Sequence, residues 1–161
     1  MNILIHVFCL ENLLCDMVDR ELLSRKLSNL SNYINELQMA DDINWEKYTV
    51  DPRSKAFVER YLHLAIEEVF DIANRLVSFH RWREPTGYRD LLLVLKENRV
   101  VPEESLSTFQ NMASFRNMLV HHYEKIDDEV VFGIFKTRLP DFILFIDLIR
   151  QWSDNVAEQS S

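Results

Sequence analysis

The segment SFRNMLVHHY, residues 114–123, places polar and ionisable side chains inside an otherwise apolar stretch. Arg116 and His121 lie in it with Asn117 and Tyr123. Cleaving RNA without a metal requires a base for the ribose 2′-hydroxyl, a cation for the charged transition state and an acid for the leaving oxygen. An imidazole exchanges protons near neutral pH, and a guanidinium binds phosphate through a planar fork of donors. These residue types could therefore cleave RNA if they share one surface.

A helical period over this segment separates the polar residues from the apolar ones. Successive residues of a helix turn by about 100°, which predicts one stripe that faces the core. That stripe comprises Met112, Phe115, Leu119 and His122. Asn117 and His121 are four residues apart and would stack on the flank beside Arg116. The plain alternative is that Arg116, Asn117 and His121 only cap or pair with neighbouring helices.

The rest of the chain predicts an all-α protein. Only two of the 161 residues are glycine, which argues against β architectures with many tight turns. Apolar residues recur at helical spacing in most of the chain, and prolines and polar loops separate the segments. The expected helices cover about 18–38, 53–80, 88–98, 103–123 and 127–155, the last kinked or divided at Pro140, with a polar loop at 40–51. We expect an up-and-down bundle of four longer helices plus the short third one.

Residues 17–157 are expected to form one helical domain, with 158–161 as a tail. Residues 1–16 are apolar and are interpreted as an extension, which an upstream start codon would explain. This segment lacks the features of a signal peptide and is too short to span a bilayer. The two cysteines, Cys9 and Cys15, match no zinc or redox spacing, so a cytoplasmic protein without membrane attachment is expected. The net charge of −8 gives no bulk attraction to nucleic acid.

A second cluster, HRWRE at 80–84, contains Arg81, Trp82 and Arg83. An aromatic ring between two arginines could stack on single-stranded RNA and neutralise its backbone. A solvated loop explains the same residues and is slightly favoured.

Another spacing, Glu59, His63 and Glu67, places three possible metal ligands four residues apart. Di-iron bundles use a Glu-x-x-His spacing that is absent here, so His63 is interpreted as structural. Neither a metal nor a cofactor is expected.

Arg116, Asn117, His121 and Tyr123 together resemble the R-x4-H-x-Y signature of the HEPN superfamily, specifically its HepT-like toxins, in which a polar residue usually follows the arginine. Four segments that follow the family's order along the chain support the resemblance. They are VDRELLSRKLSNLSNYINEL, ERYLHLAIEEVFDIANRLVS, YRDLLLVLKENRVVP and MASFRNMLVHHYEKID, the last of which contains the motif. The resemblance covers about residues 17–152, and only the first sixteen residues depart from it.

The resemblance implies the toxin of a type VII toxin–antitoxin system that acts as a metal-independent endoribonuclease on messenger or transfer RNA. In the family, two protomers form a homodimer and place both arginines and both histidines around a shared cleft. Arg116 and His121 would be catalytic and Asn117 supporting. The partner would be a minimal nucleotidyltransferase antitoxin (MNT), which silences the toxin by transferring AMP to the motif tyrosine, here Tyr123.

Two other classes of function stay open from the sequence. One is a non-catalytic HEPN module that binds nucleotides or partners a nucleotidyltransferase, and the acidic net charge favours it modestly. The other is a purely structural dimerisation domain. An intact set of Arg116, His121 and Tyr123 favours the enzyme more strongly. Growth arrest on expression without the antitoxin would separate the enzyme from the binding module.

Overall fold

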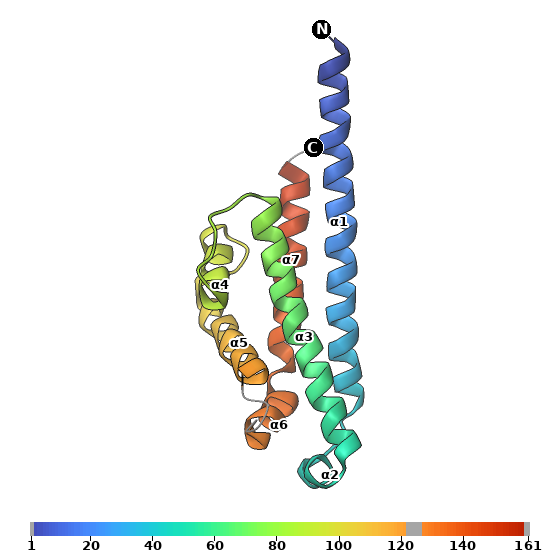
Figure 1. Ribbon diagram of the computed structural model, residues 1–161, viewed down its shortest axis with the longest axis vertical. Helices are drawn as coiled ribbons and strands as arrows, with labels where there is room; N and C mark the ends of the chain where they lie inside the picture. The colour runs from blue at the N-terminus through green and yellow to red at the C-terminus, as the bar shows by residue number, and fades with distance from the viewer. Residues whose placement is uncertain (1, 122–126, 160–161) are drawn as a thin grey trace.

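The computed structural model describes residues 2–121 and 127–159, and the side chains of residues 17, 19–119 and 127–158. These residues form helices and no strands, which confirms the all-α prediction (Figure 1). The helices are α1 (Asn2–Met39), α2 (Trp45–Val50), α3 (Pro52–Phe79), α4 (Tyr88–Glu97), α5 (Glu103–His121), α6 (Asp128–Thr137) and α7 (Leu139–Gln159). The four longer ones, α1, α3, α5 and α7, are the predicted bundle helices.

Helix α3 lies at the centre of the bundle and contacts every other helix. On one side it packs against α1, which also contacts α7, and on the other side against α4 and α5 (Figure 1). Its apolar stripe, from Val58 to Val77, is buried. On the motif helix, Phe109 is fully buried and meets Phe145 of α7 edge to face at 5.5 Å between ring centroids. The core therefore fixes α5 against both α3 and α7.

Local signals in the sequence set most helix boundaries. The Asp51 carboxylate accepts hydrogen bonds from the backbone N–H groups of the first turn of α3, and Pro52 occupies its first position. Asp127 caps α6 in the same way. The predicted division near Pro140 occurs at Arg138, which separates α6 from α7. Pro140 has no N–H to donate, which suits the first turn of a helix.

The prediction of a polar loop at 40–51 is wrong, because the segment contains α2. Asn44 caps this helix by accepting a hydrogen bond from the Lys47 N–H at 2.8 Å. Tyr48 is fully buried, and its hydroxyl lies 3.4 Å from the Glu59 carboxylate. Burial raises the pKa of Tyr48. The polar composition of the segment gave no indication that Tyr48 is buried. Tertiary packing of its ring stabilises a helix that is too short to form alone.

Helix α1 begins at Asn2 rather than near residue 18, and its N-terminal end extends beyond α7 (Figure 1). The interpretation of residues 1–16 as an extension of the domain stays a prediction. Within the part of the chain that the structure describes, no helix is long and apolar enough to cross a membrane.

Candidate active site

Helix α5 directs Arg116 and Asn117 away from its buried stripe, as the helical period predicts for these two residues. Met112, Phe115 and Leu119 are buried, which confirms these three members of the core stripe. Asn117 is exposed and Arg116 is half-buried on the side that faces α3 and α4. His121 is the last residue of α5, but its side chain lies outside the described side chains. Tyr123, like His122, lies outside the described residues.

Two neighbouring helices hold the Arg116 side chain. Its Nε donates a hydrogen bond to Glu67 Oε1 of α3 at 2.9 Å. Its guanidinium carbon lies 4.3 Å from the centroid of the Tyr88 ring at the start of α4. These contacts leave only 16% of the arginine side chain exposed. Arg116 is therefore a fixed group at the junction of α3, α4 and α5 rather than a mobile surface cation.

The carboxylates near His63 are already engaged with other partners. Glu67 accepts from Arg116, and its Oε1 lies 3.9 Å from His63 Nε2. Glu59 lies one helical turn before His63, and its Oε1 is 3.9 Å from the Lys55 ammonium. Among the described residues, no group of three or more His, Cys, Asp or Glu side chains is arranged to hold a metal ion. The three residues with four-residue spacing therefore do not converge, and Glu67 serves the arginine instead.

Trp82 and Arg83 of the cluster at 80–84 contact different parts of the chain. The Trp82 ring stacks on His80 at 5.1 Å between centroids and meets the edge of Trp152 at 5.7 Å. Arg83 binds the Asp90 carboxylate through two nitrogens, each at 2.8 Å, and also binds Glu97. The Arg83 guanidinium lowers the pKa of both carboxyl groups.

Arg81 is exposed, with a φ of 52° in the left-handed region. Trp82 and Arg83 thus brace the loop between α3 and α4, and contact of Arg81, Trp82 and Arg83 with RNA stays a prediction.

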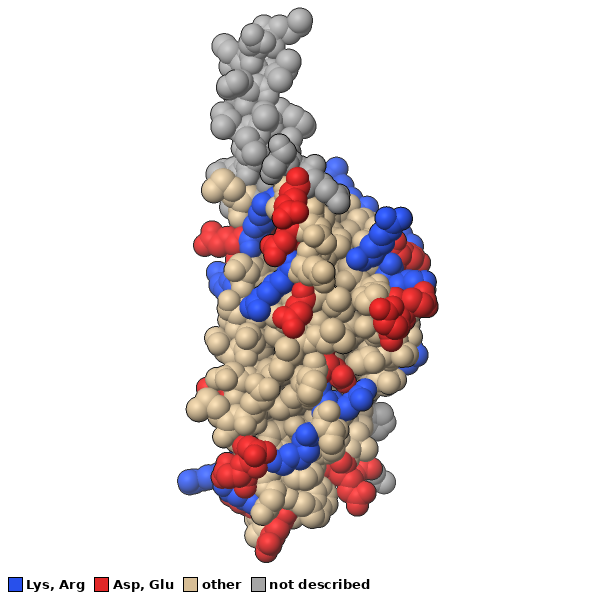
Figure 2. All heavy atoms as spheres, turned by 180° about the vertical axis from the view of Figure 1, so that it is seen from behind, with Lys and Arg blue, Asp and Glu red and all other residues tan. Residues whose placement is uncertain are grey.

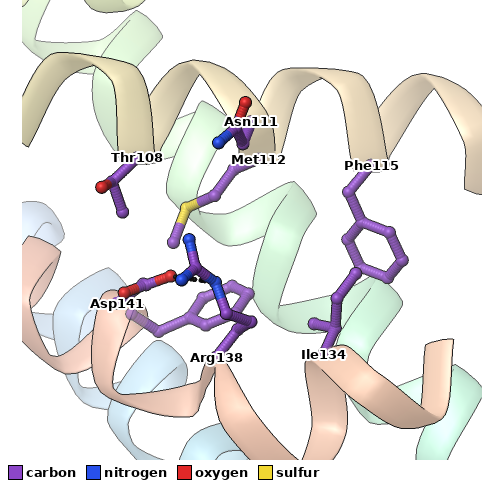
Figure 3. Close-up of a pocket in the computed structure, with 8 residues that line it drawn as sticks. Thr108, Asn111, Met112, Phe115, Ile134, Arg138 and Asp141 are labelled. Carbon is purple, nitrogen blue, oxygen red and sulfur yellow. Dashed lines mark ion pairs between the residues drawn. The ribbon is translucent and has the colours of Figure 1, made fainter. Parts of the chain in front are cut away.

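A small cavity lies between α5, α6 and the start of α7. Its volume is about 60 Å³, and its lining includes Met112 and Phe115 from α5 and Ile134 from α6 (Figure 3). Arg138 and Asp141 form an ion pair of 2.9 Å beside it. A volume of this kind holds a few water molecules.

Among the described residues, the face seen in Figure 2 carries no charge patch of one sign that would identify it as an RNA-binding surface. On the face seen in Figure 2, basic and acidic side chains are interspersed towards the two ends, with a largely uncharged middle. This mixed pattern agrees with the acidic net charge. Recognition of an anion on this face would depend on a few placed cations rather than on the overall field.

A family model described as "Ribonuclease HepT-like" matches residues 30–149. The chain belongs to the HepT-like ribonuclease family. The mRNA nuclease HepT of Shewanella oneidensis is 28% identical over 89 residues, which cover 55% of this chain and 67% of that protein. The tRNA nuclease HepT of Aphanizomenon flos-aquae is 20% identical over 143 residues, which cover 89% of this chain and 97% of that protein.

A solved structure of another HepT-like protein shares the fold. It is the tri-AMPylated HEPN toxin of Shewanella oneidensis in complex with its MNT antitoxin. The TM-score is 0.71 at 23% identity, and the match covers 80% of this chain and 96% of that one. The region matched by the HepT-like family model contains Arg116, His121 and Tyr123, together with the two partners of the arginine, Glu67 and Tyr88.

Glu67 and Tyr88 are the functional candidates that the sequence did not reveal as partners of Arg116. They lie 49 and 28 residues before the arginine, so no local spacing connects them to it. The signal available for Glu67 was an acid on a helix whose neighbouring positions are buried. For Tyr88 there was none beyond its position at the start of a helix.

Proposed function

We propose that this chain is the toxin of a HepT–MNT toxin–antitoxin pair and cleaves RNA without a metal. Arg116 and His121 are the catalytic residues, brought to a shared groove by a homodimer. The observation that carries the proposal is the fixed Arg116 side chain, held by Glu67 and Tyr88 with its terminal nitrogens not engaged by any described residue.

The orientation of Arg116 suits the binding of a phosphate group. Because Glu67 takes the Nε–H, the two terminal nitrogens remain for a ligand. Such nitrogens bind two oxygens of a phosphate at once, which neutralises charge that grows in the transition state. Asn117 is exposed beside the arginine and supplies a further polar group for the substrate.

His121 follows Arg116 by five residues, a rise of about 7.5 Å along α5. Its imidazole takes the proton of the 2′-hydroxyl as that oxygen bonds to phosphorus. The bond from phosphorus to the 5′-oxygen breaks, and the partner subunit's imidazole gives a proton to the leaving oxygen. The products are a 2′,3′-cyclic phosphate and a 5′-hydroxyl.

The proposed regulation acts on the same motif. Transfer of AMP to Tyr123 by a nucleotidyltransferase antitoxin would place a bulky anion two residues beyond His121. The added phosphate competes with RNA for Arg116 and fills the groove, as charge-adding modifications commonly do. Inhibition then requires no refolding of the bundle.

The test is cleavage of single-stranded RNA in the presence of EDTA by the wild type and by the variants Arg116→Ala and His121→Ala. Both variants are expected to lose cleavage while their helical content and oligomeric mass are retained. Arg20→Ala is the matched control, because Arg20 is exposed and lines a separate groove between α1 and α7. Full cleavage by either catalytic variant would overturn the assignment.

A second measurement tests the regulation and the competing class. Co-expression with the nucleotidyltransferase should increase the intact mass by whole adenylyl groups, and Tyr123→Phe should abolish the increase. A non-catalytic partner module would accept AMP or bind the nucleotidyltransferase, yet its unmodified form would cleave no RNA and cause no growth arrest.

A further inference from the structure

Two contacts fix different degrees of freedom of the Arg116 guanidinium. The hydrogen bond from Nε to Glu67, at 2.9 Å, sets where the group lies. The Tyr88 ring, whose centroid is 4.3 Å from the guanidinium carbon, faces the group and sets how its plane is tilted. This separation is well within the distance at which an aromatic face attracts a cation. With either contact alone, the guanidinium plane would have more than one accessible orientation.

The Tyr88 ring is itself fixed by the core rather than by the arginine. It is half-buried and meets the buried ring of Phe70 edge to face at 4.8 Å. The loop before it is braced by Arg83, which binds Asp90 and Glu97 of the same helix, α4. Among the described residues the Tyr88 hydroxyl has no hydrogen-bond partner, so the ring face is the part that contacts Arg116.

We infer that Tyr88 is a positioning residue for Arg116, whose ring face presents the guanidinium fork to the scissile phosphate; this rests on the proposed function. Two parallel N–H···O bonds to a phosphate form only when the guanidinium plane is aligned with it. Catalysis is sensitive to small misplacements of such a group, and a rigid neighbour avoids the cost of ordering it in each turnover. The alternative is that Tyr88 only fills space between α3, α4 and α5.

The two readings predict different results for replacements of Tyr88. Tyr88→Phe keeps the ring face, and Tyr88→Leu keeps apolar volume without it. Rates of RNA cleavage are measured with the full chain and corrected for the folded fraction at each condition. We expect Tyr88→Phe to stay within about twofold of the wild type. We expect kcat/KM of Tyr88→Leu to fall by about 3- to 30-fold, the range for loss of a partly desolvated cation–π contact.

Tyr61→Leu is the matched control for packing. Tyr61 is also half-buried. Its ring packs against two other aromatic rings, with centroid distances of 4.6 Å to Phe57 and 6.1 Å to Tyr33. Its corrected kcat/KM is expected to stay within about twofold of the wild type. An equal fall for Tyr61→Leu and Tyr88→Leu would mean that lost packing explains both, and the inference would be wrong.

Fluorinated phenylalanines at position 88 separate charge attraction from shape. Successive fluorines weaken the negative face of the ring with little change in its outline. A stepwise fall in kcat/KM with fluorination is expected, and an unchanged rate would refute a role for the ring face. This series also gives an answer if Tyr88→Leu fails to fold.

A spectroscopic readout distinguishes failure of the inference from failure of the proposed function. The Arg116 Nε–H signal, identified by its loss in Arg116→Lys, is shifted by the ring current of Tyr88. The shift should persist in Tyr88→Phe and disappear in Tyr88→Leu. If the wild type cleaves no RNA, the proposed function is wrong, yet this signal still tests the positioning. An unchanged signal in Tyr88→Leu would refute the positioning whatever the activity.

Discussion

The ion pair between Glu67 and Arg116 should contribute measurably to stability, unlike the exposed ion pair between Lys136 and Asp41. The perturbation is a double-mutant cycle of Glu67→Ala and Arg116→Ala. Hydrogen bonds to charged groups contribute about 1.5–3 kcal/mol, and exposed ion pairs about 0–1 kcal/mol. The Arg116 side chain is 16% exposed and that of Glu67 is 37% exposed, which lies between these cases. We therefore expect a coupling free energy of about 1 kcal/mol.

The assay is urea unfolding followed by circular dichroism, with the free energy of unfolding taken for the wild type, both single variants and the double variant. Arg116→Ala also removes the contact with Tyr88, but this loss is present with or without Glu67 and cancels in the cycle. The pair of Lys136 with Asp41 is the control, because the Asp41 side chain is 93% exposed. Its coupling should be indistinguishable from zero.

A coupling for Glu67 and Arg116 that equals the control value would refute the reasoning. It would mean that the arginine samples many orientations in solution, and a rigid guanidinium could no longer explain why this site suits phosphate. A coupling well above 2 kcal/mol would also contradict the argument, since it would require a pair much less exposed than the one observed.

Two further predictions concern the scaffold. Arg83 lowers the pKa of Asp90 and Glu97, so these carboxylates stabilise the fold above their unfolded pKa of about 4, and the effect is lost as the pH falls. The stability difference between wild type and Arg83→Gln should therefore shrink as the pH is lowered from about 5 to about 2 in urea titrations, and a constant difference would contradict this. Phe109→Ala should lower the free energy of unfolding by about 3–5 kcal/mol in the same assay, because Phe109 is fully buried against α7. The exposed control Val50→Ala should change it by at most about 0.5 kcal/mol.

The sequence predicted the bundle because its strongest signals are local. The apolar stripes of α3 and α5, the prolines at residues 52, 102 and 140 and the capping residue Asp127 all act within a few residues of the positions they determine. Helix α2 was missed because its stability comes from a tertiary contact. Tyr48 anchors it from within a segment of polar composition, and nothing adjacent in sequence indicates that this tyrosine is buried.

The same distinction explains the predictions about the site. The direction of Arg116 on α5 followed from helical spacing, which is a local property. The neighbours that hold it depend on how α3 and α4 pack against α5, which the spacing within one helix does not contain. Arg83 and Trp82 show the converse case. Their composition allowed either RNA contact or a solvated loop, with the loop slightly favoured, and the structure pairs Arg83 with Asp90 and stacks Trp82 on His80.

The contrast between Arg83 and Arg116 indicates why only one of them is a good candidate for binding RNA. Both are arginines bound to carboxylates, but Arg83 directs Nε and both terminal nitrogens to Asp90 and Glu97. Binding a phosphate there would require breaking several charge-assisted hydrogen bonds. Arg116 uses only Nε for Glu67 and keeps its terminal nitrogens for a ligand. The donors left after folding therefore favour Arg116 over Arg83 as the arginine that acts on a substrate.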